Sequence, residues 1–184
     1  MSKLRRGEYM PEFYYQTPFL SGLSIDDTVK RVNGKTALIF LRYYGCTLCQ
    51  YDMHQYAEQY EEVKKCGGQI LVVLQSDPGK LAAQTKPEDF PFEIICDPEQ
   101  KLYRQLEISA AKSMLKMADT KTLGKMISAK AGGFKHGEYE GEELQLPAVF
   151  IMDQKRCLSY VHYGKSAGDV PDIKELLALL HENQ

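Results

Sequence analysis

The sequence has no marked excess of charge and no long apolar run. Its formal net charge is −2 over 184 residues, which gives no electrostatic reason to expect a nucleic-acid partner or an anionic membrane. Apolar runs such as 37–41 are far shorter than the ~20 residues that a membrane-spanning helix needs. The basic start at 1–6 is not followed by an apolar segment, so it does not match a secretory signal. We therefore expect a soluble cytoplasmic protein.

Cysteine is also sparse, with five residues at irregular spacing: Cys46, Cys49, Cys66, Cys96 and Cys157. An odd number in a chain of this length does not fit the disulfide framework of a secreted protein. One close pair with three single cysteines fits a reducing compartment, in which a C-x-x-C pair carries out chemistry. A zinc site has little support, because there is no second C-x-x-C and the histidines lack ligand spacing. We expect no metal and no other cofactor.

What the sequence does contain is an alternation of apolar runs and helical patterns. Strands are predicted at 36–44, 69–75, 92–96, 147–152 and 157–163, and helices at 46–65, 80–84, 99–106 and 169–181. This order predicts an α/β protein with a central mixed sheet, mostly parallel, flanked by helices. It matches a thioredoxin-like fold in a single domain, 1–184. Residues 1–35 form an N-terminal extension, and 109–145 form an insert with helices at 110–118 and 121–130 and a flexible loop at 131–141.

The last predicted helix has a recognisable start and an apolar stripe. Asp169 is a candidate N-cap, and Pro171 would lie in the first turn. Earlier in the chain, the predicted helix 46–65 is expected to end at the glycine pair 67–68. These signals fix the ends of the two helices that would pack on the sheet.

The pair Cys46 and Cys49 is predicted to lie at a strand-to-helix junction. The N–H groups and positive dipole end of a helix stabilise a thiolate there. Two intervening residues allow the sulfurs to form a disulfide and to open again. In this scheme Cys46, at the more exposed end, attacks, and Cys49, on the inner stripe of the helix, resolves. The alternatives are two inert core thiols or a surface pair without function.

The remaining cysteines are given structural places. Cys96 alternates with Phe92 and Ile94 and is predicted to lie in the core. Cys66 ends a helix beside two glycines, where a frayed surface thiol is the main expectation and a resolving partner the alternative. Cys157 follows a charged turn and is expected to be exposed.

Two sequence blocks resemble the alkyl hydroperoxide reductase/thiol-specific antioxidant (AhpC/TSA) group of the thioredoxin superfamily, especially its peroxiredoxin-like branch. One is 42–49 (RYYGCTLC) with the helix that follows. The other runs from 144–153 (LQLPAVFIMD) through 160–171 (YVHYGKSAGDVP). The resemblance implies that Pro147 matches the proline that is cis in thioredoxins, faces the C-x-x-C, keeps metal ions away and exposes backbone to a substrate strand. From the residues alone, Pro147 is a trans proline that begins a strand.

The chain also departs from peroxiredoxins, which resemble one another in a T-x-x-C motif and an arginine that opens the later strand. Cys46 stands at the threonine position, Cys49 at the peroxidatic position and Pro147 at the arginine position. Arg42 is either a positive charge near the thiols or a surface residue at the end of a strand. His162 is expected to have a structural rather than a catalytic role.

The function expected is that of a thiol–disulfide oxidoreductase or peroxiredoxin-like antioxidant reductase, with Cys46, Cys49 and Pro147 as site residues. The alternatives are a thiol peroxidase with Cys49 as peroxidatic cysteine, and a non-catalytic binding module that uses the insert 109–145. The substrate would be a protein disulfide or a peroxide, and the electron donor of the thioredoxin or glutathione type. No nucleic acid or membrane partner is expected, and the resemblance makes a homodimer plausible.

Overall fold

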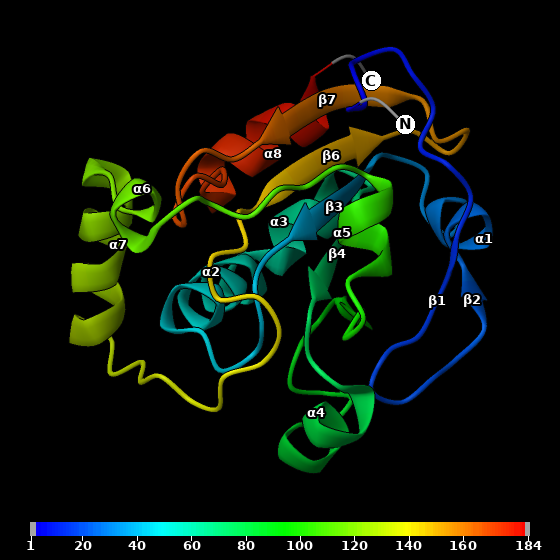
Figure 1. Ribbon diagram of the computed structural model, residues 1–184. Helices are drawn as coiled ribbons and strands as arrows, with labels where there is room; N and C mark the ends of the chain where they lie inside the picture. Colours follow the sequence, from blue (N-terminus) through cyan, green and yellow to red (C-terminus); the bar gives the residue numbers. More distant parts are fainter. Residues whose placement is uncertain (1–2, 183–184) are drawn as a thin grey trace.

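The computed structural model describes residues 3–182, and its centre is a five-stranded sheet in the order β5-β4-β3-β6-β7 (Figure 1). Strands β3, β4 and β5 are parallel, whereas β6 runs antiparallel to β3, and β7 antiparallel to β6. The strands are β3 (Thr36–Phe40), β4 (Gln69–Leu74), β5 (Glu93–Cys96), β6 (Ala148–Met152) and β7 (Leu158–Tyr163). The predicted mixed sheet is therefore confirmed.

Both faces of this sheet are buried, which explains why its central strands are apolar without interruption. Along β3, Ala37 and Ile39 face one hydrophobic cluster, and Leu38 and Phe40 face the other. The first cluster is covered by α2 (Thr47–Glu58), α3 (Tyr60–Lys65) and α8 (Ile173–His181). The second is covered by α1 (Ile25–Val29), α5 (Lys101–Gln105) and residues near the N-terminus.

The N-terminal extension packs against the second face of the sheet. It contains the short strands β1 (Tyr14–Tyr15) and β2 (Leu23–Ser24), which pair antiparallel, and it leads into α1. The side chains of Met10 and Phe13 are buried there. After β4 the chain forms α4 (Pro78–Gln84), which begins at the N-cap Asp77.

Two helix boundaries differ from the prediction. The expected helix at 46–65 is two helices, because Gln59 leaves helical geometry at φ −113° and ψ 21°. The last helix is capped by Asp172 rather than Asp169, since Asp172 and Glu175 form a reciprocal capping box. Asp169 instead accepts a hydrogen bond from the backbone N–H of Lys165 at 2.8 Å. The D-x-x-E spacing of Asp172 and Glu175 is the local signal that distinguishes the two aspartates, since no Glu or Gln lies three residues after Asp169.

The insert forms a separate lobe beside α2 (Figure 1). It holds α6 (Met114–Met117) and α7 (Thr120–Ala131), followed by a segment without regular structure. A buried ion pair fixes α7 to α2, with Lys125 Nζ 2.8 Å from Asp52 Oδ1 and side chains 12% and 5% exposed. Burial raises the pKa of Asp52 above its ordinary value, although the Lys125 ammonium lowers it. None of the helices within residues 3–182 is long and apolar enough to cross a membrane.

We expect Lys125→Ala to lower the free energy of unfolding by about 3–5 kcal/mol, because it leaves the Asp52 carboxylate buried without its partner. Urea unfolding followed by circular dichroism measures this change. Lys121→Ala is the matched control, since the ion pair of Lys121 with Glu175 is exposed and should contribute less than about 1 kcal/mol. The double variant Asp52→Asn/Lys125→Met should recover most of the loss; equal losses for both lysine variants would contradict the structural role of the pair.

Candidate active site

The thiol of Cys46 lies at the N-terminus of α2, where the chain leaves the central strand of the sheet. Cys46 is the N-cap of α2 in extended geometry, with φ −70° and ψ 123°. Its Sγ accepts a hydrogen bond from the backbone N–H of Cys49 at 3.3 Å. A thiol at an N-cap takes the place of the usual side-chain oxygen and meets the positive end of the helix dipole. The predicted strand-to-helix placement of the pair is therefore confirmed.

The guanidinium of Arg42 is directed at the two cysteines. Its Nη2 donates a hydrogen bond to Cys46 Sγ at 3.1 Å, and the backbone N–H of Arg42 donates to Cys49 Sγ at 3.3 Å. Its Nη1 donates to the carbonyl of Glu143 at 2.9 Å, which fixes the plane of the guanidinium. Of the two alternatives for Arg42, the charge near the thiols is the one that the structure supports.

These contacts shift the pKa values of the two thiols in opposite directions. Burial opposes ionisation of Cys46, but the hydrogen bond with the Cys49 thiol, the charge of Arg42 and the Cys49 amide together lower the pKa of Cys46 to about 6. Burial, the hydrogen bond with Cys46 and the negative charge of Cys46 raise the pKa of Cys49 well above its ordinary value. At pH 7 these shifts favour a Cys46 thiolate beside a Cys49 thiol.

The Cys46 side chain is 0% exposed, which corrects the expectation that it lies at an open end of the helix. Residues 134–143, which we call the strap, pass beside it and bond to residues before and after Cys46 in the chain. The N–H of Gly137 donates to the carbonyl of Gly45 at 2.8 Å, and Gln50 Nε2 donates to the carbonyl of Lys135 at 3.0 Å. The two backbones approach so closely that a Cβ on Gly45 would lie 2.2 Å from the carbonyl oxygen of Glu138.

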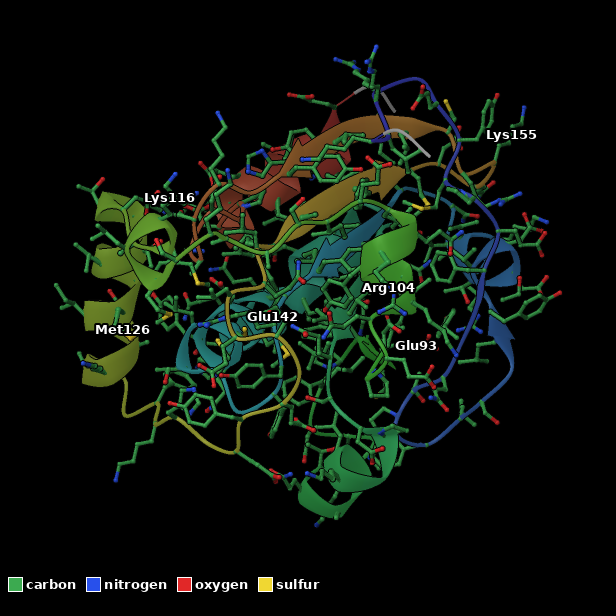
Figure 2. The ribbon with its side chains drawn as sticks, in the orientation of Figure 1. Glu93, Arg104, Lys116, Met126, Glu142 and Lys155 are labelled. Carbon is green, nitrogen blue, oxygen red and sulfur yellow. The ribbon has the colours of Figure 1, made fainter. Side chains whose placement is uncertain are left out.

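The far end of the strap is held to the loop that follows β4. The hydroxyl of Ser76 donates to the carboxylate of Glu140 at 2.7 Å, and the N–H of Glu142 donates to the side-chain oxygen of Gln75 at 2.7 Å. Glu142 is labelled near the centre of Figure 2. Residues 134–143 have no hydrophobic periodicity, so the sequence indicated only a flexible loop. No local pattern signals this contact, because Gly45 and Gly137 lie far apart in the sequence.

Pro147 lies one residue before β6, and its peptide bond is trans. The cis geometry that the family resemblance implied is thus corrected, and the trans proline inferred from the residues is found. Its backbone is also not open to a substrate strand, because the Pro147 carbonyl accepts from the Gly164 N–H at 2.8 Å and the Leu146 N–H donates to the Ser109 carbonyl at 3.3 Å. Within residues 3–182, no recorded polar contact joins Pro147 to either cysteine.

The other cysteines take structural places. Cys96 is buried, as predicted. Cys66 is only 5% exposed, and its thiol donates to the carbonyl of Val63 at 3.0 Å, which corrects the expectation of a surface thiol. The reversal of the chain at Gly67 and Gly68 folds the helix end inward. Cys157 is partly exposed.

No group of three or more His, Cys, Asp or Glu side chains that could hold a metal ion occurs in residues 3–182. His162 pairs with Asp169, with Nε2 3.0 Å from Oδ1. This contact connects β7 to the turn before α8.

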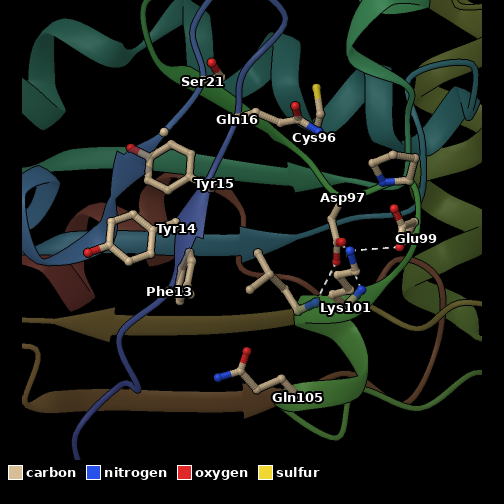
Figure 3. A pocket seen from close by; sticks show the side chains of 13 residues that line it. Phe13, Tyr14, Tyr15, Gln16, Ser21, Cys96, Asp97, Glu99, Lys101 and Gln105 are labelled. Atoms are coloured by element: carbon tan, nitrogen blue, oxygen red, sulfur yellow. Dashed lines mark hydrogen bonds and ion pairs between the residues drawn. The ribbon is translucent and has the colours of Figure 1, made fainter.

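A pocket of about 400 Å³ lies elsewhere, between β1 and α5 (Figure 3). Its Asp97 carboxylate accepts hydrogen bonds from the N–H groups of Lys101 at 2.9 Å and Leu102 at 2.8 Å and so caps α5. Burial raises the pKa of its Cys96 thiol to about 12. Its two carboxylates are already bonded, Asp97 to the N–H groups of α5 and Glu99 to Lys101 at 2.9 Å, and its thiol is protonated at neutral pH, so these groups offer no nucleophile.

The sequence matches the family described as AhpC/TSA antioxidant enzyme over residues 55–166. A relative from Arabidopsis thaliana, the chloroplastic thioredoxin-like protein AAED1, is 28% identical in an alignment of 153 residues that covers 78% of this chain and 60% of the relative. The chain thus spans less than two thirds of the length of that relative.

Solved structures of peroxiredoxins share the fold. Peroxidoxin BcpB from Mycobacterium tuberculosis superposes with a TM-score of 0.70 at 12% identity, over 98% of this chain and 99% of the other. A cysteine-to-serine variant of peroxiredoxin 6 of Arenicola marina gives 0.64 at 16% identity, over 96% and 72%. The yeast mitochondrial 1-Cys peroxiredoxin gives 0.63 at 13% identity, over 95% and 73%. At these identities the likeness concerns the fold, and it confirms the thioredoxin-like architecture.

We expect the rate of Cys46 alkylation to rise with pH through a midpoint near 6 and to level off above it, because the thiolate is the reacting form. Iodoacetamide labelling read out by mass spectrometry at Cys46 measures the profile. Arg42→Gln should move the midpoint upward by about 1–3 pH units, since it removes the adjacent opposite charge. Arg104→Gln, on α5, is the control; a wild-type midpoint at the ordinary cysteine value of about 8.5 would contradict the assignment.

Proposed function

This chain belongs to the AhpC/TSA antioxidant enzyme family, and we propose that it is a thiol-dependent antioxidant reductase in which Cys46 is the nucleophile and Cys49 the resolving cysteine. The observation that carries the proposal is the pair of hydrogen bonds on Cys46 Sγ, from the Arg42 guanidinium at 3.1 Å and from the Cys49 amide at 3.3 Å. Charge-assisted donors of this kind stabilise a thiolate more than a thiol.

The proposed first step is the reduction of a peroxide by the Cys46 thiolate. The sulfur attacks one peroxide oxygen, the O–O bond breaks and an S–O bond forms. Cys46 becomes a sulfenic acid, and the leaving alkoxide or hydroxide takes up a proton to give an alcohol or water. Arg42 keeps the sulfur ionised until the attack, and its contact with the Glu143 carbonyl keeps the guanidinium in place.

Cys49 then resolves the sulfenic acid. Its sulfur attacks the Cys46 sulfur, an S–S bond forms, and the hydroxyl leaves as water with the proton of the Cys49 thiol. The raised pKa of Cys49 keeps this thiol protonated while Cys46 is a thiolate, and the pKa of Cys49 falls in consequence once Cys46 loses its charge. An external dithiol or two monothiols of the thioredoxin or glutathione type would reduce the disulfide by exchange. Such donors are available in a reducing compartment, and we propose the cytoplasm.

Peroxide is favoured over a protein disulfide as substrate because the strap covers Cys46. A small peroxide needs only a brief opening of residues 134–143, whereas a folded protein disulfide needs the strap to leave entirely. Cys49 is disfavoured as the peroxidatic thiol because its pKa is raised, whereas that of Cys46 is lowered. Pro147 is still proposed as a site residue, but only its position directly before β6 supports this role.

We expect brief hydrogen peroxide exposure to produce a Cys46–Cys49 disulfide in the wild type and a sulfenic acid on Cys46 in Cys49→Ser. Cys46→Ser should lose most peroxide consumption, because the thiol with the lowered pKa is removed. Dimedone labelling with mass spectrometry locates the sulfenic acid, and Cys157→Ser is the matched control that should behave as wild type. Dimedone on Cys49 in the Cys46→Ser protein would instead support the reverse assignment. Absence of any peroxide reaction would leave a binding module.

We expect Gly45→Ala to speed the reaction of Cys46 with a bulky maleimide, because the new Cβ would clash with the Glu138 carbonyl at 2.2 Å and displace the strap. The ratio of bulky to small reagent rates, measured at Cys46, separates access from nucleophilicity. Gly124→Ala is the control, since its Cβ would meet nothing within 4 Å. An unchanged ratio would show that the strap does not limit access.

A further inference from the structure

The lobe formed by α6 and α7 exposes aliphatic side chains that a folded protein ordinarily buries. Met114 is 64% exposed, Leu115 85%, Leu123 56% and Ile127 70%. Leu123 and Ile127 are four residues apart and therefore share one face of α7. In Figure 1 the lobe lies at the margin of the molecule, so this face points away from the sheet.

The outward orientation of this face is fixed by contacts on the opposite side of the lobe. Lys125 is paired with the buried Asp52, and the hydroxyl of Thr122 accepts a hydrogen bond from the Gly168 N–H at 2.9 Å. Met117 and Ala129 are buried against the body. Because the inner face is already packed and bonded, α7 cannot turn to bury Leu123 and Ile127 without breaking these contacts.

Lysines accompany the exposed aliphatic side chains. Residues 109–131 contain five lysines and one acidic residue, Asp119, a net charge of +4. Lys121 and Lys125 are paired with Glu175 and Asp52, which leaves Lys112, Lys116 and Lys130. Asp119 is itself occupied, since it caps α7 and accepts a hydrogen bond from Ser166 at 2.7 Å. Figure 2 labels Lys116 on this lobe. We call the exposed set the outer ridge: Met114, Leu115, Leu123 and Ile127 with Lys112, Lys116 and Lys130.

We propose that the outer ridge docks on an anionic lipid surface. Aliphatic side chains flanked by lysines are the composition of helices that lie in a membrane interface, with the apolar groups in the acyl boundary and the ammonium groups among anionic headgroups. The centres of protein interfaces are instead enriched in aromatic residues and arginine and depleted in lysine. Residues 109–131 contain no aromatic residue and no arginine, so a lipid surface fits better than a protein partner.

The proposal revises an expectation that rested on the net charge of the whole chain. The net charge of −2 is the sum of the basic segment 109–131 and a more acidic remainder, so it does not show that the positive charges are concentrated in one segment. Docking of this kind is peripheral and needs no spanning segment. It is also independent of the cysteine chemistry, so Cys46→Ser should bind lipid as the wild type does even if the proposed function fails.

Co-sedimentation of the full chain with vesicles tests the proposal. Binding is expected to vesicles of phosphatidylcholine with phosphatidylglycerol, to weaken as salt rises and to be absent from pure phosphatidylcholine. Lys116→Gln/Lys130→Gln should lower the partition coefficient at low salt by about 25-fold, at roughly fivefold for each lysine near the surface. Leu123→Gln/Ile127→Gln should lower it by about tenfold or more through the loss of apolar burial.

Two matched variants control for general effects of surface change. Lys86→Gln/Lys155→Gln removes the same charge elsewhere, and Leu20→Gln replaces a leucine that is 59% exposed outside the lobe; both should bind as wild type, with circular dichroism confirming the fold of every variant. Lack of binding to anionic vesicles, or equal losses in the control variants, would overturn the proposal. So would a dimer in sedimentation velocity that Leu123→Gln/Ile127→Gln dissociates, because the ridge would then be a protein interface.

Discussion

A negative sulfur buried at the start of α2 sets the main requirement on the surrounding structure. Cys46 is 0% exposed, and an ionised group taken out of water needs a nearby positive charge and hydrogen-bond donors. Arg42 supplies the charge because it leaves β3, the central strand, two residues after its end. The Cys49 amide supplies the second donor because the helix begins at that point. Strand, helix and the carbonyl of Glu143 therefore meet around one atom.

The insert ties this site to the rest of the molecule. Its α7 is held to α2 by the buried pair of Lys125 with Asp52, and Asp52 is on the same helix that Cys46 caps. Its strap then crosses the cysteines and is held by Gln75 and Ser76 after β4. One insertion between β5 and β6 thus supplies a cover for the nucleophile on one side and an exposed basic ridge on the other.

Family membership and site chemistry rest on different parts of the chain. The family match covers residues 55–166, which include neither cysteine of the pair. The reading of Cys46 as nucleophile depends instead on the local geometry of β3 and α2. At Pro147 the family resemblance and the local geometry disagree. The resemblance implied a cis peptide bond and a backbone open to substrate, whereas the bond is trans and the Pro147 carbonyl accepts a hydrogen bond from Gly164. The N–H of Leu146, the residue before Pro147, also donates to the Ser109 carbonyl, so the backbone around Pro147 offers no free edge to a substrate strand.

The sequence by itself determined the sheet and the location of the pair, because buried strands at 36–40 and 69–74 carry unbroken apolar runs and the C-x-x-C follows one of them directly. It also placed Cys96 in the core through strand alternation. Tertiary structure alone decided that Arg42 faces the thiols, that Cys46 is covered and that Cys66 is buried. The first two depend on contacts between residues far apart in the chain, such as Arg42 with Glu143 and Gly45 with Gly137, and local periodicity contains no information about which distant backbone will approach.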